Sequence, residues 1–143
     1  MDDEELGEIL INIFLLHHFF KNHDFQYRNF DGRRKITFNH YLTLMILKKR
    51  KKLPISEIGR LTSVKKQNMT YIIDRLVEIG LVKRVPDMSD RRVVNITITD
   101  GGIKYLDKWQ KAKTKDLRSF DDGDLKKLAA LLKIFNSKLS KEE

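Results

Sequence analysis

Residues 53–82 read LPISEIGRLTSVKKQNMTYIIDRLVEIGLV, and this stretch decides the fold. Pro54 stands where a short helix to about Leu61 begins, since proline is tolerated in the first turn of a helix. After a turn, apolar residues at helical spacing predict a second helix that runs to about Ile79 and stops at Gly80. Two short helices across a tight turn, the second with a polar leading end, predict a helix-turn-helix.

A β-hairpin is expected directly after this second helix. Its strands are residues 81–85 and 91–98, and residues 86–90 form the turn between them. In the second strand apolar residues alternate with their neighbours, with Val94, Ile96 and Ile98 set against Val93, Asn95 and Thr97. This period of two is typical of a half-buried strand. A hairpin joined to a helix-turn-helix is a wing, so the sequence predicts a winged helix-turn-helix.

Helical spacing of apolar residues continues on both sides of the motif. Helices are expected over residues 4–22, from an N-cap at Thr37 to the basic run 48–52, from Thr99 to about Ser119, and after the caps Asp121 and Asp122. The first helix is apolar on most of its circumference, and in so small a protein a second subunit is the expected cover. Residues 23–36 have no period and are expected to form an exposed connection.

The predicted fold is therefore mainly α with a small β-hairpin wing. The length of 143 residues indicates a single domain, residues 1–143, with one core. Residues 37–99 would form the winged helix-turn-helix, and residues 1–36 and 100–143 would supply helices for dimerisation.

The distribution of charge points to a polyanionic partner. The chain has a net charge of +9, and residues 48–92 hold thirteen Lys or Arg against five Asp or Glu. Three interpretations of the basic run 48–52 stay open. It is a solvated helix end where cations suit the helix dipole, a set of phosphate contacts or, more weakly, a localisation signal.

Other features argue against several classes of function. The chain has no cysteine, which excludes disulfides, thiolate zinc sites and sensing by thiol oxidation. The acidic N-terminus is unlike a signal peptide, and the most apolar stretch, residues 9–20, is too short to span a membrane, so a cytoplasmic location is expected. We find no catalytic or cofactor motif, and expect neither an enzyme nor a cofactor. The histidines lack ligand spacing and are expected to bind no metal: His17, His18, His23 and His40.

The second motif helix and the wing carry the candidate contacts to double-stranded DNA. Polar residues gather at the leading end of the helix: Lys65, Lys66, Gln67, Asn68, Thr70 and Tyr71. This part of a recognition helix faces base edges, where Gln and Asn bind adenine; the alternative is a solvated polar face. Arg91 and Arg92 are candidates for the minor groove, although one of them is expected to pair with an aspartate of the turn instead. Lys83 and Arg84 are expected to contact phosphates.

The same segment resembles the MarR (multiple antibiotic resistance regulator) family of transcriptional regulators. The resemblance is carried by residues 54–85, PISEIGRLTSVKKQNMTYIIDRLVEIGLVKRV, and by residues 87–102, DMSDRRVVNITITDGG. It implies a homodimer joined through its first and last helices, a pseudo-palindromic operator, and a wing arginine at Arg92. Two positions depart from the family pattern. Lys65 replaces a small capping residue or an acid, and Gly101 adds a second glycine to the turn.

The resemblance also implies a small, commonly aromatic anion as effector, bound between the dimer helices and the winged region. Its lining would come from the first helix, the second helix and the helix after the wing: Phe14, His17, His18, His40, Tyr41, Tyr105 and Trp109. The same residues fit equally well as plain core. The favoured function is a ligand-responsive, homodimeric transcriptional repressor. The alternative is an architectural or protein-interaction module without sequence-specific DNA binding.

Overall fold

A computed structural model describes the backbone of residues 1–23 and 36–140, and the side chains of residues 1–18 and 36–140. The connection predicted over residues 23–36 therefore lies almost wholly outside the described residues.

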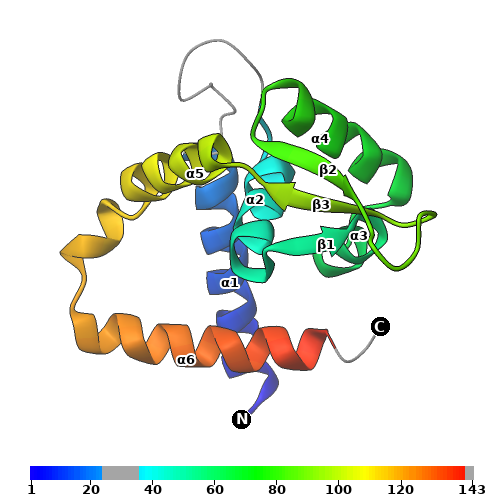
Figure 1. Ribbon diagram of the computed structural model, residues 1–143. Coiled ribbons are helices and arrows are strands. Elements are labelled where there is room, and N and C mark those ends of the chain that lie inside the picture. The colour runs from blue at the N-terminus through cyan, green and yellow to red at the C-terminus, as the bar shows by residue number, and fades with distance from the viewer. Residues whose placement is uncertain (24–35, 141–143) are drawn as a thin grey trace. The chain divides into compact units, whose positions relative to one another are not determined.

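The chain divides into two compact units, Met1–Trp109 and Gln110–Glu143. A single domain over the whole chain stays a prediction. The elements of the first unit follow the predicted order, with one added strand (Figure 1). They are α1 (Asp3–His23), α2 (Phe38–Arg50), β1 (Lys52–Pro54), α3 (Ile55–Thr62), α4 (Lys66–Glu78), β2 (Val82–Pro86), β3 (Val94–Ile98) and α5 (Asp100–Lys113), which continues into the second unit. The helices α3 and α4 form the predicted helix-turn-helix, and the hairpin β2–β3 forms the predicted wing.

The strand β1 was not predicted from the sequence. It completes a three-stranded antiparallel sheet in the order β1-β3-β2, in which Lys52 pairs with Thr97 and Val82 pairs with Ile98. A strand of three residues is too short to show a period of two, so only its pairing with a segment more than forty residues away defines it.

The alternation predicted for β3 holds for only part of the strand. Ile96 is buried as expected, but Val94 is exposed and Asn95 is buried. Val94 pairs with Pro86 at the end of the hairpin next to the wing turn, beyond the core. Asn95 lies in the central strand, where β1 and β2 cover both of its edges. The single polar face expected of a hairpin strand therefore does not form.

The hydrophobic core of the described residues lies between residues 36 and 109, which we call the winged lobe. The core side chains come from Ile36 and from six elements, α2, α3, α4, β2, β3 and α5, or from the residue next to them: Ile36, Tyr41, Leu44, Leu47, Ile58, Met69, Ile72, Ile73, Leu76, Leu81, Val82, Ile96, Leu106 and Trp109. The four residues of this set on α4 are the stripe predicted from helical spacing. The core thus holds α4 and the wing together as one body.

Two glycines and a threonine join α4, the wing and α5. Gly80 has a φ of +77° and ends α4, as predicted. Thr99 Oγ1 accepts a hydrogen bond from the Gly102 N–H at 3.0 Å and donates one to the Gly80 carbonyl at 2.6 Å. A Cβ atom on Gly102 would lie 2.1 Å from the Leu81 carbonyl oxygen, whereas one on Gly101 would meet nothing closer than 3.6 Å. Of the adjacent glycines 101 and 102, the packing of the junction therefore requires only Gly102.

Both ends of α2 have special backbone contacts. The backbone N–H of Thr37, the predicted N-cap, donates to His40 Nδ1 at 3.0 Å, so a histidine takes the place that Gln or Glu has in a capping box. At the other end, Lys51 has φ 69° and ψ −53°, a region that favours glycine. Its N–H donates to the Leu47 carbonyl at 2.8 Å, and its carbonyl accepts from Thr97 Oγ1 at 3.0 Å. These two bonds hold the strained backbone in place.

The helix after the wing is shorter than predicted. α5 ends at Lys113, and a separate 3-10 helix, η1 (Asp116–Ser119), replaces the expected continuation to Ser119. Thr114 Oγ1 donates to the Gln110 carbonyl at 2.9 Å, a bond that bends helices and competes with their regular ladder. The spacing of apolar residues does not report this break in the helix.

The last helix, α6 (Asp122–Leu139), begins where it was predicted, and the Asp121 carboxylate caps it by accepting from the Asp124 N–H at 3.1 Å. No residue of α6 is buried. The large apolar side chains that it exposes are 44% to 62% exposed: Leu128, Leu131, Leu132, Ile134, Phe135 and Leu139. Those of α1 are 40% to 61% exposed: Leu6, Ile9, Leu10, Ile11, Ile13, Phe14, Leu15 and Leu16. We call α1 and α6 the terminal helices.

Candidate DNA-binding surface

The face of α4 that points away from the core carries the predicted contact residues. All six are exposed: Lys65, Lys66, Gln67, Asn68, Thr70 and Tyr71. Lys65 is the N-cap residue, and its ammonium group, which can only donate hydrogen bonds, cannot cap the helix. Thr70 is exposed, and its Oγ1 donates to the Lys66 carbonyl at 3.0 Å. Tyr71 is 70% exposed, far more than a core aromatic residue.

The electrostatics of this helix end favour an anion. The first turn of α4 contains no acidic residue, and the lysines at its start add to the positive end of the helix dipole. The unpaired backbone N–H groups at a helix start donate to phosphate or to carbonyl acceptors. The polar face of α4 therefore combines charge for a phosphate backbone with amide side chains for base edges.

An ion pair ties the wing to α4. Arg84 Nη2 of β2 donates to Asp74 Oδ1 of α4, and both side chains are partly exposed. Arg84, predicted as a phosphate contact, is thus already bound to a carboxylate, whereas Lys83 next to it is exposed. The role of Asp74 was missed, because its partner lies on another element and neither helical nor strand spacing connects the two.

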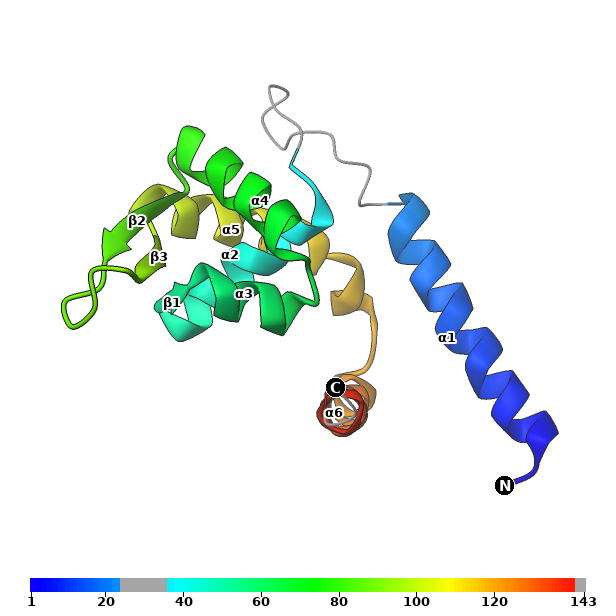
Figure 2. The same ribbon diagram turned by 90° about the vertical axis from the view of Figure 1, so that its right-hand side faces the viewer.

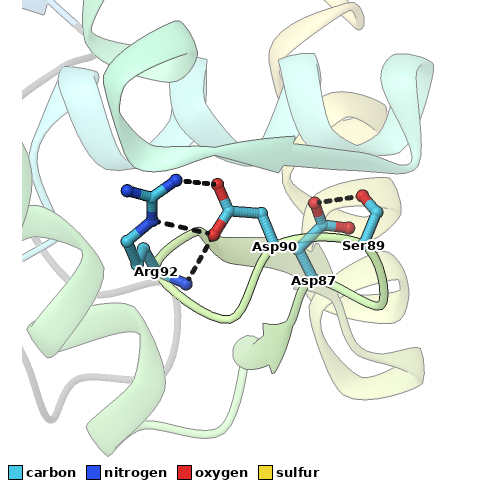
Figure 3. Close-up of polar contacts among 4 residues, drawn as sticks. All are labelled: Asp87, Ser89, Asp90 and Arg92. Carbon is cyan, nitrogen blue, oxygen red and sulfur yellow. Dashed lines mark hydrogen bonds and ion pairs between the residues drawn. The ribbon is translucent and has the colours of Figure 1, made fainter.

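A second carboxylate holds the wing turn (Figure 3). Asp90 Oδ1 accepts from the Arg92 backbone N–H at 3.0 Å and from Arg92 Nε at 3.2 Å, while Asp90 Oδ2 accepts from Arg92 Nη2 at 3.3 Å. The bonds from the Arg92 guanidinium make the larger contribution to lowering the pKa of the Asp90 carboxyl, and the bond from the Arg92 backbone N–H lowers this pKa further. Ser89 Oγ adds a bond to Asp87 Oδ2 at 3.1 Å. Of the two wing arginines, Arg92 is the one that pairs with the turn.

The wing still presents two guanidinium groups to solvent. The Arg92 side chain is 91% exposed in spite of its bonds to Asp90. Arg91 is also exposed, and no ion pair of its side chain is found within residues 36–140. The hairpin projects beyond the body of the winged lobe, with these residues at its turn (Figure 2). A projecting, cationic hairpin has the shape required to enter a narrow groove.

The residues predicted to line an effector site separate into two groups. On α2 and α5, the Tyr41 ring stacks on Trp109 with centroids 4.2 Å apart and on Tyr105 with centroids 6.1 Å apart. The hydroxyl groups of Tyr41 and Tyr105 lie 3.2 Å apart, and Tyr41 and Trp109 are buried. Phe14, His17 and His18 are instead exposed on α1. The first group forms core of the winged lobe.

His40 is a buried histidine that stays neutral. It is 2% exposed, and burial, followed by the charge of Arg75, lowers its pKa to about 4. Because His40 Nδ1 accepts from the Thr37 N–H, the proton of the neutral ring lies on Nε2. Among the buried side-chain atoms of the described residues, His40 Nε2 is the one without a hydrogen-bond partner.

The described residues contain neither a cluster of metal ligands nor a helix suited to a membrane. Within residues 1–18 and 36–140, no group of three or more His, Cys, Asp or Glu residues is placed to hold a metal ion. None of the helices in this part of the chain combines the length and the apolar character needed to cross a bilayer.

Comparisons with known proteins identify the family of this chain. The model of the MarR family matches residues 36–94, which include α2 to α4 and most of the wing. YpoP of Bacillus subtilis, an uncharacterized HTH-type transcriptional regulator, is 30% identical over 110 residues, which are 76% of this chain and 77% of that protein. MdtR of the same species, an HTH-type transcriptional repressor, is 35% identical over 74 residues, 51% of this chain and 48% of that protein.

Solved structures share the fold at lower identity. NadR in complex with 4-hydroxyphenylacetate is 20% identical, with a TM-score of 0.73 over 100% of this chain and 96% of that one. A mutant of MarR from E. coli complexed with operator DNA is 24% identical, with a TM-score of 0.65 over 94% of this chain and 99% of that one. The family match, the similarity to YpoP and the shared fold show that this chain belongs to the MarR family of DNA-binding, HTH-type transcriptional regulators.

Proposed function

We propose that the chain acts in the cytoplasm as a homodimeric repressor that binds a pseudo-palindromic operator. The observation that carries this proposal is a contrast within the chain. The winged lobe has a closed core and an exposed, cationic α4 and wing, whereas the terminal helices expose almost all of their apolar side chains. The first region supplies the contacts to DNA, and the second supplies the surface for a second copy. No enzymatic activity is part of the proposal.

The contacts are assigned by chemistry. On α4, Gln67 and Asn68 would read base edges, because their amides donate and accept together. The other candidates on this helix would add phosphate contacts or apolar contacts to thymine methyl groups: Lys65, Lys66, Thr70 and Tyr71. Lys83 would bind phosphate, and Arg84 would do so only in addition to its pair with Asp74. Arg91 would enter the minor groove, and Arg92 would do so only in addition to its pair with Asp90.

The dimer follows from the exposed apolar surface. A helix of 18 residues without a tertiary contact is marginal in water, and α6 exposes a row of leucine, isoleucine and phenylalanine side chains. A second copy would cover this surface and would place two α4 helices roughly 34–36 Å apart, as two half-sites require. Repression is supported by the similarity to MdtR, which is a repressor.

A charge placed on α6 tests the dimer. We expect Leu132→Lys to give a monomer in sedimentation velocity and to weaken operator binding at least about 100-fold, because the second half-site no longer binds intramolecularly. Lys133→Gln, on the same helix, is the matched control and should stay dimeric. A dimeric Leu132→Lys protein with normal operator affinity would contradict the proposal.

The role of the wing is tested by comparing variants that should lose affinity for the operator with a variant that should lose affinity for every DNA sequence. Arg91→Ala and Arg92→Ala should each weaken operator binding by about 1–3 kcal/mol if their side chains enter a groove. Lys83→Ala should weaken binding to all sequences equally and reduce the slope of log K against log salt by about one. If both arginine variants bind the operator normally, the wing has no part in recognition.

We further propose a small aromatic anion as effector, which makes DNA binding responsive to a ligand. NadR, with the same fold, has been solved with 4-hydroxyphenylacetate, and here the unpartnered Nε2–H of His40 is a donor on the helix that carries the Tyr41 stack. Phe14, His17 and His18 would join the lining from α1. Such a ligand acts only if it binds the DNA-free conformation more tightly than the DNA-bound one.

Titration of the protein–operator complex with 4-hydroxyphenylacetate and with salicylate tests the effector. We expect either anion to release DNA, and peroxide to have no effect, since the chain has no cysteine. His40→Phe removes the Nε2 donor while keeping an aromatic ring, and should raise the anion concentration needed for release. Release by peroxide but by neither anion would overturn this proposal.

A further inference from the structure

A second cationic surface lies at the base of the wing. We call it the wing-base cluster and define it as Lys49, Lys51, Lys52 and Lys104, all of which are exposed. None of these four ammonium groups takes part in an ion pair among the residues that the structure describes. Of the nearby acidic residues, Asp107 pairs with Lys48 and Glu57 pairs with Arg60, while Asp100 lies one helical turn before Lys104 on α5. With four lysines against this one carboxylate, the cluster stays strongly cationic.

The cluster lies at the opposite end of the sheet from the wing turn. Lys52 pairs with Thr97 near the end of β3, and β1 begins at the end of the sheet that is remote from the β2–β3 turn (Figure 1). Arg92 lies in the wing turn, five positions before Thr97, so the chain between the two residues spans at most roughly 16 Å. Lys104 is one helical turn before Asp107, which the end of α2 contacts through Lys48. The cluster is therefore remote from the wing turn, which is the part of the hairpin proposed to contact the operator.

The backbone of Lys51 adds an independent observation. Its φ of 69° belongs to a region that favours glycine, and a lysine there is strained. Strained backbone persists where the surrounding structure holds it, and such positions are common at functional sites. Glycine would relieve the strain but would remove an ammonium group from the middle of the cluster. The presence of lysine is thus better explained by its charge than by the fold.

We propose that the wing-base cluster binds the phosphate backbone of a second DNA duplex, apart from the one held by α4 and the wing. Backbone binding needs charge but little exact geometry, which fits four flexible lysines on three neighbouring segments. The protein would then bridge two DNA segments. This proposal rests on the DNA binding proposed above and adds an architectural role to it, without sequence specificity.

A two-step capture experiment with the full chain tests the bridge. The protein is first bound to an immobilised operator duplex at saturation, and a labelled duplex of unrelated sequence is then added at physiological salt. The triple variant Lys49→Gln/Lys52→Gln/Lys104→Gln should capture about tenfold less of the second duplex, while operator binding in the first step changes less than about twofold. The matched control, Lys126→Gln/Lys133→Gln/Lys138→Gln on α6, removes the same charge and should capture normally.

The variant Lys51→Gly distinguishes a role of the Lys51 charge in binding DNA from a structural role of this residue. We expect it to raise the denaturation midpoint, because it relieves strain, and at the same time to lower capture of the second duplex. A purely structural role of Lys51 predicts the first effect without the second. Normal capture by the triple variant, or no capture by the unmodified protein, would overturn the proposal. Failure of the first step would contradict operator binding, and the bridge with it.

Discussion

The winged lobe buries its apolar side chains in a core of its own, whereas the terminal helices leave theirs exposed. In the winged lobe, six elements share one core, and side chains such as Leu44, Ile58 and Ile96 are fully buried. In the terminal helices, apolar side chains are as frequent, yet α6 buries none of its residues. Similar composition therefore leads to a self-sufficient body in one region and to a surface that needs a partner in the other.

We therefore expect substitutions in one region to leave the properties of the other region unchanged. Changes in the winged lobe should alter the free energy of unfolding directly. Changes in the terminal helices should alter association, and DNA binding through it, while the fold of the lobe persists. Substitutions of graded severity test whether the two responses are separable.

The largest effect is expected at the junction of the wing and α5. A Cβ on Gly102 would lie 2.1 Å from the Leu81 carbonyl oxygen and 2.7 Å from Ile98 Cγ1, so Gly102→Ala forces the backbone apart. We expect the free energy of unfolding of the lobe to fall by about 3 kcal/mol or more in urea denaturation. Gly101→Ala is the control one residue away. It has room for its methyl group and should be neutral or stabilising by up to about 1 kcal/mol.

Equal destabilisation by the two alanines would show that the junction is not close-packed. The sequence alone could not predict which of these two adjacent glycines is required, because the difference lies in their packing. The added glycine at position 101 attracted attention as a departure from the family pattern, yet it is the neighbour, Gly102, that the packing requires.

Local patterns explain why most of the winged lobe was predicted from the sequence. Pro54, Gly80 and the stripe on α4 act within a few residues of one another, and each appears in the structure as predicted. The exposed face of α4 follows from that stripe, because residues off the stripe must face solvent.

What could not be predicted depends on partners far along the chain. β1 exists only through its pairing with β3, and Asp74 gains its role only through Arg84. The burial of His40 and Asn95 likewise follows from the packing of whole elements, since neither residue type is usually inside a core. A polar residue becomes internal when its neighbours cover it, and a single sequence does not list those neighbours.

A smaller effect is expected from acid. The pKa of His40 is lowered to about 4 in the folded lobe and returns to its ordinary value near 6.5 on unfolding. The unfolded chain therefore binds more protons between these values, so stability is complete above pH 6.5 and falls as the pH drops toward 4. We expect the free energy of unfolding to fall by about 2–3 kcal/mol between pH 6.5 and pH 4. Denaturation at each pH, with the fluorescence of the buried Trp109 as the signal, measures this loss.

His40→Gln isolates this contribution. A glutamine at the third position of the helix keeps an acceptor for the Thr37 N–H, as in a capping box, but it does not titrate. The difference in stability between the variant and the unmodified protein should therefore narrow as the pH falls. His17→Gln on α1 is the control and should leave the pH dependence unchanged. If His40→Gln loses as much stability as the unmodified protein, another group causes the acid sensitivity.

The smallest effect is expected at the cap of α6. This prediction distinguishes most directly between a role of α6 in the stability of the winged lobe and a role in self-association. The Asp121 carboxylate accepts from the Asp124 N–H at 3.1 Å, and removal of such a cap costs about 1 kcal/mol of helix stability. Because α6 buries no residue within the chain, Asp121→Ala should leave urea unfolding of the winged lobe unchanged. The cost should appear instead as roughly fivefold weaker self-association per protomer in sedimentation equilibrium. Asp122→Ala, in the first turn but without the capping bond, should cost only a few tenths of a kcal/mol. An Asp121→Ala protein whose lobe unfolds more easily while its association stays normal would show that α6 supports the lobe and not the dimer.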